Sequence, residues 1–263
     1  MIEKAIELPY LKIRTEHDVQ WRFFLGELPE LVSYMCDARK NNAAGTIAVC
    51  NVHMFVEADR DPMLASAINS TGFALCDGQP IAWLASITSG RKVSRITGPD
   101  LFSHILQNEL RNLRVALVGG NETLLAKIRS KLSTEHGANL LTINPGYVTA
   151  NGVPRHDIID TLKLFDPDIT FVGLGCPKQE KWMTQAAAAG VRGLHVGVGA
   201  AFEYFSGDIK RAPVILRRLG LEWLYRLVQQ PRLLNRYGRT NPAFLLWLIK
   251  FTIRQKWFGH GVS

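Results

Sequence analysis

The chain has 263 residues, 47% of them hydrophobic, and a formal net charge of +8. Such a chain can form one large domain, or one domain with an appendage, around a proper core. No apolar run approaches the ~18 residues that span a bilayer, and the first residues lack a signal-peptide pattern, so we expect a cytoplasmic protein. The four cysteines (Cys36, Cys50, Cys76 and Cys176) have no CxxC spacing, which favours buried thiols over disulfides or a zinc site.

Short β-rich apolar runs alternate with helical patterns along residues 1–212, which we take as one catalytic domain. Strands are expected over 46–51, 73–76, 114–118, 139–143, 169–174 and 193–198. Helices are expected over 62–70, 79–89, 99–110, 122–135, 156–165 and 177–189. The alternation predicts an α/β fold with a mostly parallel, Rossmann-like sheet flanked by helices.

Ligands bind such sheets beyond the carboxyl ends of the strands. Several residues directly follow predicted strands and are therefore expected to line one crevice: Asn51, Asp77, Gly119, Gly120, Gly175 and Gly199.

The segment GLGCPKQEKW, residues 173–182, lies between a predicted strand and a predicted helix. Its glycines let the backbone approach a ligand closely, and the helix start offers free N–H groups and the positive end of a dipole. Lys178 and Gln179 add a cation and an amide at the same turn. The segment therefore suits a phosphorylated or nucleotide ligand, and a well-capped turn with a surface lysine is the alternative.

Basic residues dominate the end of the chain. Residues 210–263 contain 11 basic residues and one acid, Glu222, so they carry +10 and leave −2 for the rest. Two helical segments, over 219–230 and 242–258, mix these cations with tryptophans and leucines. Residues 213–263 are therefore expected to form a basic amphipathic appendage at an anionic membrane surface. Packing of both helices on the sheet, with solvated arginines, is the alternative, and Glu222 has helical spacing to Arg218 and Arg226.

An ordered set of motifs makes the chain recognisable. They are Asn51 after a strand, CDG at 76–78, RITGPD at 95–100, VALVGG at 115–120, NPGY at 144–147, DPDITFVGLGCPKQEKW at 166–182, GVGAAFEYFSGDIKRAP at 197–213, LEWLYRL at 221–227 and QQPRLLNRY at 229–237. With these motifs the chain resembles the WecG/TagA/CpsF family of bacterial glycosyltransferases, glycosyltransferase family 26, and within it the exopolysaccharide-assembly branch. One departure is Val49, at a position where many members carry threonine, so a hydroxyl contact to substrate is lost there.

The resemblance implies an inverting hexosyltransferase at the inner face of the cell membrane. Such enzymes move a sugar from a UDP-sugar to a polyprenyl-diphosphate-linked sugar acceptor during exopolysaccharide, capsule or wall-polymer synthesis. It assigns the base to Asp77 and a catalytic role to Arg95. We expect donor contacts from Asn51, Gly119, Gly120, Tyr147, Gly175, Lys178, Gln179 and Gly199, and contacts to the acceptor diphosphate from Arg211 and Arg218.

The residues themselves are consistent with these roles. Asp77 is a sole carboxylate between an apolar strand and a glycine, which suits a general base, with an N-cap of the next helix as the alternative. His53 beside it is either a hydrogen-bonding structural residue or a substrate contact. For Tyr147, a place in the loop core is the alternative to a sugar or base contact.

No metal or other cofactor is expected. The two DxD stretches, 59–61 and 166–168, suit a helix N-cap and a turn into a strand, and no set of several oxygen ligands is visible for a hard cation. Arg95, backbone N–H groups and arginines of the appendage are expected to stabilise the leaving diphosphate, because a guanidinium donates bidentately to phosphate.

Three other interpretations differ from a membrane-bound transferase. A dinucleotide-dependent oxidoreductase requires G-x-G-x-x-G after its first strand, and the spacing at Gly119-Gly120 does not match. A non-enzymatic nucleotide- or nucleic-acid-binding protein with a basic tail explains the cations, but it does not explain the interleaved tryptophans and leucines, so we expect no nucleic-acid partner. A homo-oligomer contact is a further interpretation of the tail.

Overall fold

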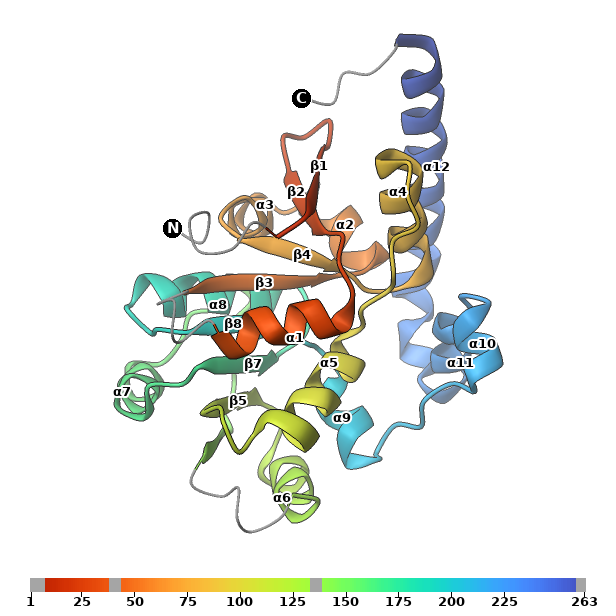
Figure 1. The fold of residues 1–263 in the computed structure, drawn as a ribbon. Coiled ribbons are helices and arrows are strands. Elements are labelled where there is room, and N and C mark those ends of the chain that lie inside the picture. Colours follow the sequence, from red (N-terminus) through yellow and green to blue (C-terminus); the bar gives the residue numbers. More distant parts are fainter. Residues whose placement is uncertain (1–7, 38–43, 133–138, 259–263) are drawn as a thin grey trace.

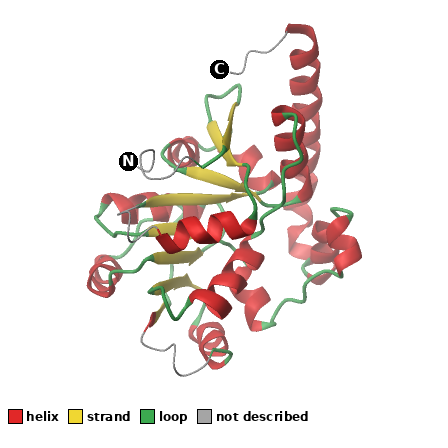
Figure 2. Ribbon diagram, viewed as in Figure 1, coloured by secondary structure: helices red, strands yellow, loops and turns green. Residues whose placement is uncertain are grey.

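The computed structural model describes residues 8–37, 44–132 and 139–258, and these form one eight-stranded sheet with helices on both faces (Figures 1 and 2). The strand order is β1-β2-β4-β3-β8-β7-β5-β6, and every neighbouring pair is parallel except β1 and β2. The predicted α/β fold is confirmed. The strands are β1 (Tyr10–Arg14), β2 (Gln20–Phe24), β3 (Gly45–Cys50), β4 (Phe73–Cys76), β5 (Val115–Gly119), β6 (Leu140–Ile143), β7 (Ile169–Gly173) and β8 (Leu194–Gly197).

Alternate side chains of each strand point to opposite faces, and each face has its own buried layer. In β7, Ile169 and Phe171 join one layer and Val172 joins the other. The first layer is covered by α1 (Leu28–Asp37), α5 (Gly98–His104), the π-helical turn η2 (Ile105–Glu109), α6 (Glu122–Ser130) and α9 (Ala201–Ser206). The second is covered by α2 (Val52–Ala58), α3 (Pro62–Asn69), α4 (Gln79–Ser89), α7 (His156–Phe165) and α8 (Lys178–Ala188).

The six predicted strands and six predicted helices of the body are all present, with ends that differ by a few residues. The largest difference is at 122–135, where α6 ends at Ser130 and residues 133–138 lie outside the described part of the chain. The hairpin β1–β2 and the helices α1, α2 and α9 were not predicted. The two hairpin strands are only five residues long, and Trp21 and Phe23 of β2 become fully buried through tertiary packing.

The appendage consists of α10 (Val214–Arg218), α11 (Glu222–Gln229), the 3-10 turn η4 (Pro231–Leu233) and α12 (Leu234–Phe258). Sequence predicted one helix over 219–230, but the chain turns at Gly220, whose φ of +73° is left-handed. A Cβ at Gly220 would lie 3.0 Å from the Cβ of Gln79, so glycine permits both the turn and the close approach to α4. The helix predicted over 242–258 begins earlier, at Leu234, and continues through Pro242, which lacks the N–H of one helical bond.

Aromatic packing joins the appendage to the body. Phe244 of α12 is only 4% exposed, and its ring lies edge-on to Phe55 of α2 at 5.4 Å between centroids. Trp247, one turn later, lies 4.7 Å from the same Phe55 ring. The long helix α12 therefore completes a core layer of the sheet domain, and Figure 1 shows it running alongside α2. Among the described residues, no helix is both long and apolar enough to cross a membrane.

Truncation of Phe244 tests whether the appendage is part of this core. We expect Phe244→Ala to lower the free energy of unfolding by about 3 kcal/mol, because it removes a buried ring and leaves a cavity. Leu245→Ala is the matched control, since its side chain is 57% exposed. Urea denaturation of both variants measures the difference, and equal stability of the two would contradict the shared core.

Candidate active site

A cavity of about 400 Å³ lies at the carboxyl ends of the strands in the middle of the sheet. Residues that follow β3, β4, β7 and β8 form its floor, and α4, α11 and α12 close it from the side of the appendage. This volume is in the range of small-molecule sites. Six residues selected from the sequence lie on its wall: Asn51, Asp77, Arg95, Gly175, Gln179 and Gly199.

Asp77 follows β4 directly and presents its carboxylate to the cavity. Burial first, and then the negative charge of Glu222, raise the pKa of this carboxyl to about 6, against the lowering effect of Arg95, Arg226 and a hydrogen bond from Asn51. The alternative role as an N-cap is wrong: the N-cap of α4 is Gly78, and no side chain caps that helix. Asp77 is therefore a carboxylate available for proton transfer near neutral pH.

Asn51 and His53 flank this carboxylate from the start of α2. Asn51 is the N-cap of α2, because its side-chain oxygen accepts from the backbone N–H of Met54 at 3.1 Å. His53 lines the cavity with its Nδ1 buried and without a hydrogen-bond partner. Burial and the charge of Arg236 lower the His53 pKa to about 4, so the ring is neutral at physiological pH and can serve as a donor or acceptor toward a ligand.

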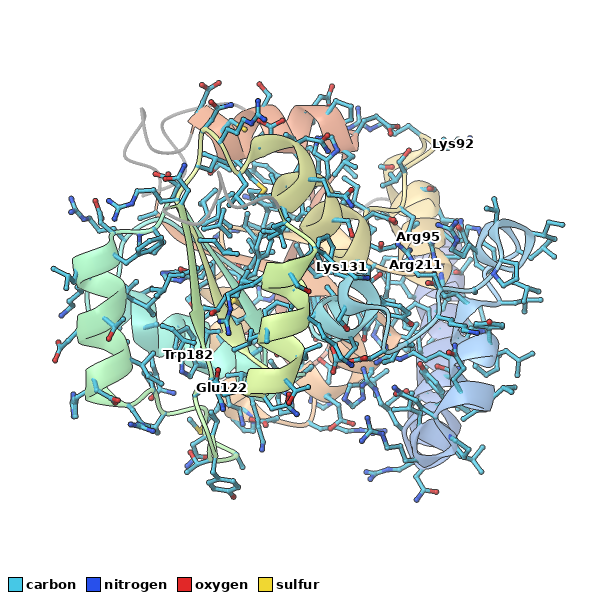
Figure 3. The ribbon with its side chains drawn as sticks, turned by 90° about the horizontal axis from the view of Figure 1, so that it is seen from below. Lys92, Arg95, Glu122, Lys131, Trp182 and Arg211 are labelled. Carbon is cyan, nitrogen blue, oxygen red and sulfur yellow. The ribbon has the colours of Figure 1, made fainter. Side chains whose placement is uncertain are left out.

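Arg95 is held by a carboxylate of the appendage. Its Nη1 lies 2.8 Å from Oε2 of Glu222, and the other oxygen of Glu222 lies 3.6 Å from Nε of Arg211. Arg211 in turn makes two hydrogen bonds to Asp100, at 2.5 and 3.3 Å. Figure 3 shows Arg95 and Arg211 next to one another on the side of the body that faces the appendage. Helical spacing offered Arg218 or Arg226 as the partner of Glu222, whereas the ion pairs of the described side chains join it to Arg95 and Arg211, both outside its own helix.

Gln179 connects the two glycine turns of the floor rather than projecting freely. Its Oε1 accepts from the backbone N–H of Gly175 and of Gly199, each at 3.1 Å, and its Nε2 donates to Glu180 at 2.7 Å. The side chain is only 3% exposed, and a Cβ at Gly197 would lie 2.8 Å from Nε2. Gln179 thus fixes the loops after β7 and β8 relative to one another.

Gly119 and Gly120 do not lie on the cavity wall. Gly119 has a φ of +137°, and a Cβ there would lie 2.7 Å from the carbonyl oxygen of Gly173 in the neighbouring strand. A Cβ at Gly120 would lie 2.7 Å from the side chain of Leu124. Close packing against β7 and α6 therefore accounts for both glycines.

The structure also separates Lys178, Tyr147 and Arg211 from the cavity wall. Lys178 donates to the carbonyl of Val148 at 3.1 Å and lies 5.6 Å from the ring of Tyr147, which is 87% exposed. Arg211 lies behind Glu222, paired with Asp100. The side chain of Arg218 lies outside the described part of the structure.

Two arginines that were not selected from the sequence line the cavity, Arg226 of α11 and Arg236 of α12. The Nε–H of each is buried without a hydrogen-bond partner. Arg226 also lies 5.8 Å from the ring of Tyr204, another wall residue. Buried guanidinium groups with unused donors suit an anionic ligand. In the sequence, only the arginine-rich composition of the appendage indicated that such residues could reach the site.

Large apolar side chains also line the cavity. They come from α4, α11 and α12 and are Trp83, Trp223, Phe244, Leu245 and Leu248. The cavity therefore combines charged and apolar lining, which suits an amphiphilic ligand.

The described residues contain no group of three or more histidine, cysteine, aspartate or glutamate side chains placed to hold a metal ion. The DxD residues have other partners: Asp61 caps α3 and pairs with the buried Lys181, and Asp168 accepts from the backbone N–H of Arg114. Asp166 ends α7 in a left-handed conformation. The described cysteines are free thiols, two of them fully buried.

The model of the Glycosyl transferase WecG/TagA/CpsF family matches residues 19–258, which include the sheet, the cavity and nearly all of the appendage. The chain belongs to this family. It is therefore a glycosyltransferase of cell-surface polysaccharide synthesis, and the interpretation as a non-enzymatic binding protein falls away. In a WecG/TagA/CpsF glycosyltransferase the cavity around Asp77 is the candidate active site, because it gathers the carboxylate, the arginines and the glycine turns in one place.

Removal of the Gln179 amide tests the connection between the glycine turns. We expect Gln179→Ala to lower the free energy of unfolding by about 2 kcal/mol, because two backbone N–H groups lose their acceptor. Gln185→Ala is the control on the same helix, since its amide donates to backbone carbonyls near the surface. Chemical denaturation decides, and a Gln179→Ala variant as stable as the control would show that the turns hold without the amide.

Proposed function

We propose that this glycosyltransferase transfers a hexosyl unit, with inversion, from a UDP-sugar to a sugar on a polyprenyl diphosphate during synthesis of exopolysaccharide, capsule or wall polymer. The observation that carries the proposal is the Asp77 carboxylate, whose pKa is raised to about 6, in a cavity that also holds arginines with unused donors. An inverting transfer needs this combination, a base for the acceptor and cations for the leaving diphosphate.

In the proposed step the Asp77 carboxylate accepts the proton of the acceptor hydroxyl as that oxygen attacks the anomeric carbon. The bond between the anomeric carbon and the diphosphate breaks, and UDP leaves with the electron pair. Asp77 lines the cavity, whose wall is proposed to keep bulk water from competing with the bound acceptor.

The charge that grows on the diphosphate is proposed to be stabilised by Arg95, Arg226 and Arg236 rather than by a metal ion. All three line the cavity, and two of them have a buried Nε–H without a partner. The turn at Gly175 is open, because a Cβ there would meet nothing within 4 Å, and it is proposed to let the donor approach the backbone closely. The proposal needs no cofactor.

The acceptor is proposed to enter from a membrane surface beside α4, α11 and α12, the helices that supply the apolar lining of the cavity. Large apolar side chains are exposed on these helices, namely Trp83 and Ile87 of α4, Val228 of α11, and Leu246, Ile249 and Ile253 of α12. Exposed cations, Arg232, Arg239 and Lys250, lie on the same segment. This combination of apolar and cationic groups supports a peripheral position on the inner face of the cell membrane.

Replacement of Asp77 tests the chemistry. We expect Asp77→Asn to bind UDP with wild-type affinity and to turn over about 10²-fold more slowly or worse, because the amide cannot accept the proton. In the wild type, kcat/KM should rise with pH through about 6 and then level, since the base acts only when it is deprotonated. Mass-spectrometric detection of UDP release from a panel of UDP-sugars with a polyprenyl-diphosphate sugar acceptor, in buffer with EDTA, measures both.

Two outcomes would count against this mechanism. Wild-type turnover in Asp77→Asn removes that carboxylate from the reaction. If the wild type loses turnover in EDTA and recovers it on addition of Mg²⁺ or Mn²⁺, the leaving diphosphate is stabilised by a metal ion and not by the arginines alone.

The membrane surface has its own test, flotation with anionic vesicles of phosphatidylglycerol. We expect Leu246→Ser combined with Ile249→Ser to reduce flotation strongly, and Arg232→Glu combined with Arg239→Glu to reduce it in a salt-dependent way. Arg236 is left unchanged because it faces the cavity. Leu164→Ser is the control, as this exposed leucine lies on α7, away from the appendage (Figure 1). Undiminished flotation of both double variants would place the membrane contact elsewhere.

A further inference from the structure

Glu222 is in an unusual position for a carboxylate. It is the only acidic residue in a segment, 210–263, that carries +10, and its side chain is only 19% exposed. Its partners among the described side chains are Arg95, 127 residues earlier in the chain, and Arg211. Burial of a carboxylate is costly unless strong partners compensate, so the arrangement requires a reason beyond surface charge.

Arg95 lines the cavity together with two carboxylates, those of Asp77 and Glu222. The charge of Arg95 lowers the pKa of Asp77, while the charge of Glu222 raises it. The guanidinium of Arg95 forms its ion pair with Glu222, through Nη1 at 2.8 Å. If that partner were absent, the guanidinium would be free to turn to Asp77 and hold its carboxylate in an ion pair, which would make it a poorer base.

We propose that Glu222 is a positioning residue of the transfer reaction: from the appendage it holds Arg95 away from Asp77, so that the carboxylate stays free as the base and the guanidinium faces the diphosphate. This inference rests on the proposed function. It also couples activity to docking of the appendage, because α11 brings Glu222, Trp223 and Arg226 to the cavity together. The contact of Gly220 with Gln79 fixes the start of the same helix against α4.

Several other groups face Asp77 and contribute to its protonation. They are Arg226 of α11, Arg236 of α12, the amide of Asn51, and the buried thiols of Cys50 and Cys76 at the ends of β3 and β4. The two thiols have raised pKa values because of burial and are neutral near pH 7. Glu222 differs from these groups and from Arg95 because it places a negative charge near Asp77 at neutral pH. Removal of that charge is therefore expected to lower the pKa of Asp77.

The test compares Glu222→Gln, which keeps the shape and removes the charge, with Glu222→Asp, which keeps the charge on a shorter side chain. For Glu222→Gln we expect the acid limb, which is the rise of kcat/KM with pH on the acidic side of the profile, to move to lower pH by about half a unit or more. We also expect kcat to fall about tenfold, with a smaller change in the KM of the donor. For Glu222→Asp we expect a lower kcat with the acid limb at its wild-type pH. Asp208→Asn is the charge-matched control, because this exposed aspartate pairs with Lys127, outside the cavity.

Action through Arg95 has a separate readout. In an Arg95→Gln background, Glu222→Gln should reduce kcat little further, since the guanidinium that it positions is already gone. An equal reduction in both backgrounds would overturn the proposal, as would a Glu222→Gln variant with wild-type kcat and a wild-type acid limb. If Glu222→Gln is unfolded at the assay temperature, Glu222→Asp serves as the test in its place. A wild-type kcat in Glu222→Asp would then overturn the proposal.

A measurement without substrate separates this inference from the proposed function. Carbon-13 NMR titration of the Asp77 carboxyl in the ligand-free full-length protein should give a lower pKa in Glu222→Gln than in the wild type or in Asp208→Asn. If no UDP-sugar is consumed by the wild type, the proposed function fails while this titration still reports on Glu222. An unchanged or raised Asp77 pKa in Glu222→Gln would show that Glu222 does not control this carboxylate.

Discussion

The ion pair between Arg95 and Glu222 joins two parts of the molecule that the sequence keeps 127 residues apart. Both side chains are largely buried, so each depends on the other for compensation of its charge. Because Glu222 begins α11, the pair also fixes where Trp223 and Arg226 meet the cavity. The floor of the site belongs to the sheet, but its charge balance and one wall are complete only when the appendage is docked.

The rest of the site has the same composite character. Asp77, Asn51 and the glycine turns are carried by the ends of parallel strands, which every doubly wound sheet brings to one edge. Gln179 then uses one amide to connect the turns after β7 and β8. The appendage adds the guanidinium groups of Arg226 and Arg236 and most of the large apolar side chains of the lining. Charged and apolar lining in one cavity matches the chemistry of a lipid-linked acceptor, whose diphosphate and hydrocarbon chain need opposite environments.

The core explains why the appendage cannot be regarded as an addition to a finished domain. Phe244 and Trp247 of α12 pack on Phe55, and they share a buried layer with residues of β2, β3 and β4. The exposed faces of α11 and α12 retain large apolar side chains that no described element covers. One face of the appendage thus stabilises the body. The other face stays exposed, and it is the face for which we propose contact with the membrane.

The sequence by itself determined the α/β fold, the place of Asp77 and the glycine turns at strand ends, and the family, because hydrophobic periodicity and ordered motifs are local signals. It missed β1, β2, α1, α2 and α9, which are short or stabilised by burial rather than pattern. Only the tertiary structure decided the partners of charged groups: Glu222 pairs with Arg95, Lys178 points to the loop at Val148, and Arg226 and Arg236 enter the cavity. Helical spacing reports which residues share a face of one helix, whereas an ion pair between distant elements depends on how those elements pack.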